Sequence, residues 1–132
     1  MKKELKKKFE QTIKNNIEGI KLWYHYGRRF ENEIRKRVNK VRMSNKYYIT
    51  EINEEMREEL SRIGREISQN GMKKETGKRK KVYELFSTIG EDKIKMVWKF
   101  SANQIAKLKK VQIKEIKEYF EKNENNSREI RN

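Results

Sequence analysis

Residues 13–42 read IKNNIEGIKLWYHYGRRFENEIRKRVNKVR, and this stretch decides the fold class. Its apolar residues recur at spacings of three and four, which is the pattern of one face of an α-helix. The same spacing continues back toward the N-terminus. The apolar positions are Leu5, Phe9, Ile13, Ile17, Ile20, Tyr24, Phe30, Ile34, Val38 and Val41. The sequence therefore predicts a long amphipathic helix in the first third of the chain.

A second series of residues runs beside this apolar seam and is basic at every position. Its members fall seven residues apart: Lys7, Lys14, Lys21, Arg28, Arg35 and Arg42. At 100° per residue the basic arc also takes in Arg29, Lys36 and Lys40, while Glu31 and Glu33 fall on its shoulders. A solvated helix face usually mixes charges of both signs. A helix face whose central charges are all positive favours contact with phosphates. Arg binds a phosphate with two parallel hydrogen bonds, and Lys binds it as a point charge.

Two glycines and a cluster of aromatic residues occur within this predicted helix. Gly19 and Gly27 each weaken a straight helix by about 1 kcal/mol relative to Ala, so we expect the helix to bend there around a curved partner. Trp23, Tyr24 and Tyr26 lie just before Gly27. Two interpretations stay open for these aromatic side chains: stacking on nucleic-acid bases, or packing against another helix or subunit, which is their commoner role at an apolar seam.

Charge and composition limit the classes of function. The 132 residues include 35 Lys and Arg against 20 Asp and Glu, a net charge of +15, and residues 1–46 alone contribute +10. Such an excess attracts polyanions, of which nucleic acid is the first candidate and an anionic membrane surface the second. The absence of Cys excludes disulfides and thiolate metal sites, and one His with no paired carboxylates predicts no metal, no cofactor and no enzyme.

Further helical segments are predicted after residue 47. The first begins at Thr50, a good N-cap residue, and stops at Asn70-Gly71. Residues 72–81 then have the composition of a loop, whose basic run Lys78-Arg79-Lys80-Lys81 we expect to make a second phosphate contact. A short helix over residues 82–89 follows and is closed by Gly90.

The last third of the chain completes an all-α fold. Residues 93–100 alternate like a strand but also suit a helix, and we predict helix because no partner strand is evident. Ser101 and Gln104 form a capping box, which predicts a helix from there to about Lys122. The expected architecture is an extended basic N-terminal helical arm (residues 1–46), a small four-helix bundle (47–122) that supplies subunit contacts, and a polar tail (123–132).

This layout resembles the major coat proteins of filamentous archaeal viruses, the lipothrixvirus group and their rudivirus relatives. The likeness lies in the chain length, the basic N-terminal arm from Lys2 through Arg42, and the helical body from about Thr50 to Lys122. The resemblance implies a coat subunit that pairs with itself or with a second, related coat protein and wraps linear double-stranded DNA. It also implies a helical nucleocapsid of many copies, in contact with an envelope lipid layer, located in the virion and in the host cytoplasm before assembly.

We therefore expect a structural protein that binds double-stranded DNA through phosphates. The alternatives are a helix-turn-helix regulator, for which Gly27 could mark the turn, a chromatin-like architectural protein, and an RNA-binding protein. The residues expected to bind nucleic acid are Lys3, Lys7, Lys14, Lys21, Arg28, Arg29, Arg35, Lys36, Lys40, Arg42, Lys78, Arg79 and Lys80, with Trp23, Tyr24 and Tyr26 as stacking or interface residues.

Overall fold

The computed structural model describes the backbone of residues 2–131 and the side chains of residues 2–124. Over that part of the chain every regular element is helical, which confirms the predicted all-α class. In chain order the elements are α1 (Lys2–Lys40), α2 (Asn45–Arg62), α3 (Gln69–Ile89), the 3₁₀ helix η1 (Glu91–Val97), α4 (Ala102–Ala106) and α5 (Lys110–Arg131). None of these described helices is long and apolar enough to cross a membrane.

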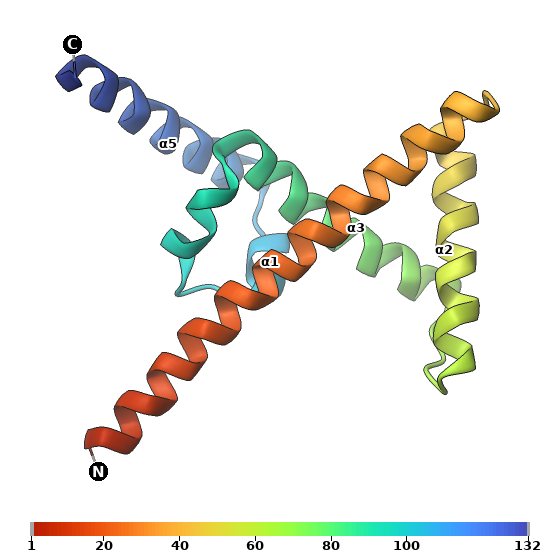
Figure 1. Cartoon of the computed structure of the whole chain (residues 1–132), viewed down its shortest axis with the longest axis horizontal. Helices are drawn as coiled ribbons and strands as arrows, with labels where there is room; N and C mark the ends of the chain where they lie inside the picture. The colour runs from red at the N-terminus through yellow and green to blue at the C-terminus, as the bar shows by residue number, and fades with distance from the viewer. Residues whose placement is uncertain (1, 132) are drawn as a thin grey trace.

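The crossing of α1 and α3 is the centre of the molecule (Figure 1). α1 runs as one helix through Gly19 and Gly27 and is drawn without a kink in Figure 1, so the expected bend at these glycines is absent. Gly27 lies at the crossing, where a Cβ atom on it would come within 2.6 Å of the Tyr83 Cβ and 2.8 Å of the Arg79 carbonyl oxygen. Gly27 therefore permits the two helix backbones to approach closely.

Two hydrophobic clusters lie on either side of this crossing, and α1 contributes to both. The larger cluster joins α1, α3, η1, α4 and α5, and its buried residues are Ile20, Tyr24, Val82, Leu85, Phe86, Ile89, Ile94, Ala102, Ile105, Ala106 and Phe120. The smaller one joins Phe30 and Ile34 of α1 to Tyr48 and Ile52 of α2. By contrast, every described side chain from Lys2 to Thr12 is exposed. α1 thus begins with an exposed segment and continues as a core helix.

α2 is attached to α1 by polar as well as apolar contacts. The Arg37 guanidinium of α1 forms ion pairs with Glu33 on its own helix at 3.1 Å and with Glu51 and Glu55 of α2 at 2.6 and 2.7 Å. The hydrogen bond with Glu55 is the main cause that raises the pKa of Arg37 above its ordinary value, and Glu33 adds to it. This network fixes the angle between the two helices.

The predicted boundaries of α2 and α3 were wrong. α2 begins after the N-cap Ser44 instead of at Thr50, and it ends at Arg62, before Gly64 with φ +78°. Residues 72–81, expected to be a loop, are part of α3. Met72 and Thr76 are buried there, and the Thr76 hydroxyl donates a hydrogen bond of 2.7 Å to Asn53 Oδ1 of α2. Packing against α1 and α2 thus outweighs the weak helix propensity of two glycines.

The C-terminal part keeps some of the predicted features. Gly90 ends α3, residues 91–97 form a 3₁₀ helix instead of a strand, and the capping box of Ser101 and Gln104 is present. The single helix predicted from Ser101 to Lys122 is wrong, because α4 ends at Ala106 and α5 starts at Lys110. This break lets Ile105 and Ala106 enter the larger cluster while α5 turns to bury Phe120 in it. The backbone of the predicted polar tail is helical up to Arg131.

The close approach at Gly27 predicts opposite effects for two alanine substitutions in α1. Gly27→Ala should lower the free energy of unfolding by about 1–3 kcal/mol, because the new methyl group meets atoms of α3 that cannot rotate aside. Gly19→Ala should raise it by up to about 1 kcal/mol, because nothing lies within 4 Å of the new Cβ. Urea unfolding followed by circular dichroism measures both. Equal effects of the two substitutions on the free energy of unfolding would contradict a close contact between α1 and α3 at Gly27.

Candidate nucleic-acid interface

The packed part of α1 presents a basic face to solvent. Burial of Ile20, Tyr24, Phe30 and Ile34 turns one side of the helix toward the body. The opposite side carries exposed cations: Lys21, Arg28, Arg29, Arg35, Lys36 and Lys40. None of these six forms an ion pair with a side chain in the described range 2–124. We call this set the outer basic face.

The acidic residues of this part of α1 are mostly turned inward. Glu31 pairs with Lys80 of α3 at 3.4 Å, and Glu33 pairs with Arg37 at 3.1 Å. Both carboxylates therefore neutralise cations at the helix junctions and leave the outer basic face with a single sign around its centre. Its span from Lys21 to Lys40 is about 28 Å at 1.5 Å per residue. That length approaches one turn of a DNA duplex, about 34 Å.

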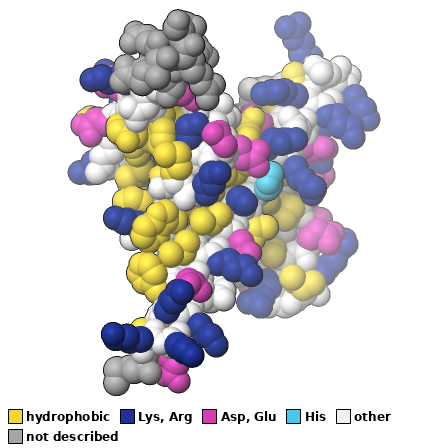
Figure 2. Space-filling view, turned by 60° about the vertical axis from the view of Figure 1, so that its left-hand side comes forward, with side chains coloured by type: hydrophobic (Ala, Val, Ile, Leu, Met, Phe, Trp, Pro, Cys, Tyr) yellow, Lys and Arg dark blue, Asp and Glu magenta, His cyan; other side chains and the backbone are white. Residues whose placement is uncertain are grey.

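The first fourteen residues of α1 add further exposed cations at Lys3, Lys7 and Lys14. Figure 2 shows Lys and Arg side chains grouped at this end of the molecule, at the bottom of the view, with hydrophobic side chains gathered above them. The segment is attached to the body through Phe9, whose ring centroid lies 6.0 Å from that of Trp98. Arg42 is also exposed but follows the end of α1, so the seven-residue series continues on one helix only as far as Arg35.

The three α3 residues predicted as a phosphate-binding loop have structural partners instead. Lys78 and Arg79 pair with Glu75 at 4.0 and 3.0 Å, and Lys80 pairs with Glu31. The Arg79 guanidinium also lies over the Trp23 ring, 4.6 Å from its centroid, and 5.5 Å from that of Tyr26. The expectation of a free basic loop was therefore wrong. Arg79 holds the crossing of α1 and α3 together.

The aromatic cluster also serves packing. Tyr24 is buried in the larger cluster, with its ring centroid 5.5 Å from that of Tyr83, and Trp23 packs against the same cluster. Tyr26 is stacked beside Phe30. Burial raises the pKa of the Tyr26 hydroxyl above its ordinary value, and the nearby Thr76 and the Arg79 charge act in the opposite direction. Between the two interpretations of Trp23, Tyr24 and Tyr26, these contacts favour packing over base stacking.

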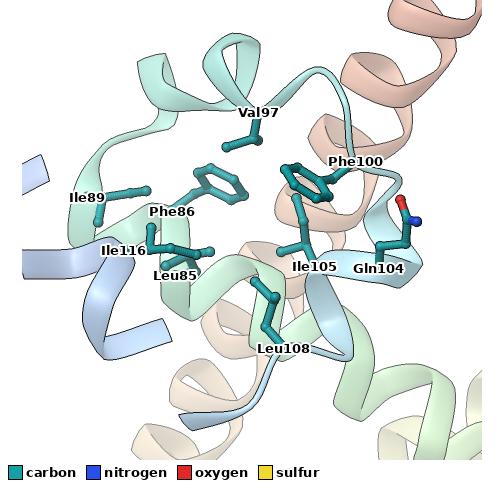
Figure 3. Close-up of a pocket in the computed structure, with 9 residues that line it drawn as sticks. All are labelled: Leu85, Phe86, Ile89, Val97, Phe100, Gln104, Ile105, Leu108 and Ile116. Atoms are coloured by element: carbon teal, nitrogen blue, oxygen red, sulfur yellow. The ribbon is translucent and has the colours of Figure 1, made fainter. Parts of the chain in front are cut away.

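A small apolar cavity lies between α3, α4 and α5, and it offers no chemistry. Figure 3 shows the lining side chains, Phe86, Phe100 and Leu108 among them, pointing toward one another, with Gln104 as the polar group. Its volume of about 70 Å³ is far below that of small-molecule sites, about 300–1,000 Å³. No acid, base or nucleophile lines it. Within residues 2–124, no group of three or more His, Asp or Glu side chains could hold a metal ion.

The comparisons with known proteins found no similarity for this chain. No protein-family model matches it, and neither does a curated protein or a solved structure.

The structural role of Arg79 predicts that its loss weakens the fold. Arg79→Ala should lower the free energy of unfolding by about 1–2 kcal/mol, because it removes the cation–π contacts with Trp23 and Tyr26 together with the packing of the aliphatic stem. Lys81→Ala removes an exposed cation two residues away and should change stability by less than about 0.5 kcal/mol. Thermal unfolding of the two variants decides the point, and equal melting temperatures would refute this role.

Proposed function

We propose that this chain is a structural protein that binds double-stranded DNA along α1 and packages it without reading its sequence. One observation carries the proposal: the six cations of the outer basic face are exposed and unpaired among the described side chains, while the neighbouring Glu31 and Glu33 pair with inward cations. Arg and Lys side chains on a straight helix suit a regular row of phosphates. Contacts of this kind bind every duplex alike and weaken steeply with salt.

A helix-turn-helix regulator has less support. The four-residue connection 41–44 between α1 and α2 has a suitable length, but such a motif reads bases with its second helix. Here the second helix would be α2, which carries five glutamates against three basic residues. The six cations of the outer basic face lie on the first helix, which is 39 residues long. The distribution of charge therefore favours backbone contact over base reading.

We further propose that many copies assemble on the duplex, as coat or nucleocapsid subunits in a helical filament. Large hydrophobic side chains remain exposed on the single chain, at fractions of 48% to 67% for Leu5, Phe9, Met96, Phe100 and Val111. Exposed apolar surface of this kind usually marks a protein contact. Neighbouring copies, or a second related subunit, would cover these side chains, and residues 47–122, as a small four-helix bundle, would supply the subunit contacts. This part of the proposal rests on the layout shared with filamentous viral coat proteins and on these exposed side chains.

The proposal predicts a specific loss of salt dependence. The triple variant Lys21→Ala, Arg28→Ala, Arg35→Ala should bind duplex DNA more weakly, and the slope of log affinity against log salt should become shallower by about 2.7, or 0.9 for each lost phosphate contact. Fluorescence anisotropy with two unrelated duplexes measures both quantities, and both duplexes should lose affinity equally.

The matched control is the triple variant Lys73→Ala, Lys74→Ala, Lys81→Ala, which removes the same charge from exposed positions of α3. It should keep more of the wild-type slope. If both triple variants change the slope equally, net charge and not α1 governs binding, and the outer basic face is not the interface.

A further inference from the structure

A second surface of one charge sign lies outside α1. Residues 93–114 contain seven lysines and no Asp or Glu. Six of the lysines have exposed side chains: Lys95, Lys99, Lys107, Lys109, Lys110 and Lys114. We call these six the body lysines. The seventh, Lys93, differs from them because it pairs with Asp92 at 2.8 Å and with Glu124 at 3.5 Å.

The body lysines have no ion-pair partner among the described side chains. Elsewhere in the body, Arg57, Arg62 and Arg79 are neutralised by Glu54, Glu59 and Glu75, while other exposed lysines such as Lys73, Lys74 and Lys81 also have no ion pair to a described side chain. Four of the body lysines are also close together along the chain. Lys107 and Lys109 occupy the connection between α4 and α5, and Lys110 and Lys114 lie one helical turn apart at the start of α5. Such a concentration of like charge repels itself unless a polyanion neutralises it.

Acidic side chains of another copy offer this surface no regular row of charge. α2 and α5 each carry five glutamates, but four of those in α2 are already paired with Arg37, Arg57 or Arg62, and those of α5 alternate with lysines of the same helix. Only Glu58 of α2 has no ion pair to a described side chain. A phosphate backbone instead offers one charge for about every 1.7 Å of duplex.

The position of the body lysines separates them from the outer basic face. They belong to η1, α4 and α5 and the connections between them, and both η1 and α4 pack against the inward side of α1 (Figure 1). The buried residues Ile20 and Tyr24 of α1 thus face the elements that carry the body lysines, whereas the cations of the outer basic face are exposed to solvent.

We propose that the body lysines form a second phosphate-binding surface, so that one molecule holds two duplex segments and bridges them. This inference rests on the proposed function, because the first duplex is held by α1. It adds that the protein draws DNA segments together in addition to covering one segment.

A bridging assay tests the inference with the full chain. A biotinylated duplex on beads is mixed with protein and a fluorescent duplex of unrelated sequence, and the fluorescent duplex recovered on the beads is measured. The test variant is Lys107→Gln, Lys109→Gln, Lys110→Gln, Lys114→Gln. The control variant is Lys73→Gln, Lys74→Gln, Lys81→Gln, Lys122→Gln, which removes the same charge from other exposed positions. Binding of each protein to a single duplex is measured in parallel by anisotropy.

We expect the test variant to recover about tenfold less fluorescent duplex than the wild type, with single-duplex affinity within about threefold. The control variant should bridge like the wild type. Bridging by the test variant at the wild-type level, or an equal loss in the control, overturns the inference while leaving the proposed function in place. Failure of the wild type to bind any duplex overturns both. If the test variant does not fold by circular dichroism, the double variant Lys95→Gln, Lys99→Gln takes its place with the same expectations.

Discussion

The close contact between α1 and α3 is the constraint on which the rest of the structure depends. Gly27 brings the α1 backbone against Arg79 and Tyr83, and Arg79 lies over Trp23 at the same point. Because the stability of helices in proteins comes mostly from packing of an amphipathic face, this crossing is what orients α1 in the fold. The larger cluster on one side and the smaller cluster on the other then prevent rotation of α1 about its axis.

Fixing that rotation also determines where the charges lie. Once Ile20, Tyr24 and Ile34 face the body, the cations offset by about a third of a turn or more face solvent. Glu31 and Glu33 fall at the edges of the packed side, within reach of Lys80 and Arg37. The same apolar packing that folds the protein thus separates paired charges at the helix junctions from exposed cations that have no ion pair to a described side chain. Net charge alone does not produce this separation of charges. It also requires that the basic residues of α1 keep a constant offset from its apolar residues along the helix.

The sequence predicted α1 and the location of its cations well. A repeat sustained over 35 residues shows clearly which residues share one face of the helix. It failed where tertiary contacts overruled local signals. Gly71, Gly77 and the run of cations at 78–81 have the composition of a loop, yet buried Met72 and Thr76 and the pairing of Lys80 with Glu31 make them helix. The break at residues 107–109 carries no Gly or Pro and follows from the need to bury both Ala106 and Phe120. Neither effect is visible without the partner helices.

The unpaired cations also connect folding to binding. With a net charge of +15 on 132 residues, the folded chain brings like charges closer together than the unfolded chain does, so repulsion acts against folding in the free protein. A polyanion that contacts the outer basic face removes more of this repulsion in the folded state than in the unfolded state, because only the folded chain holds those six cations on one side of a helix. Binding and folding are therefore linked, and a bound polyanion stabilises the folded chain by an amount that grows with its concentration. A protein with this charge pattern is therefore more stable with a bound polyanion than without one.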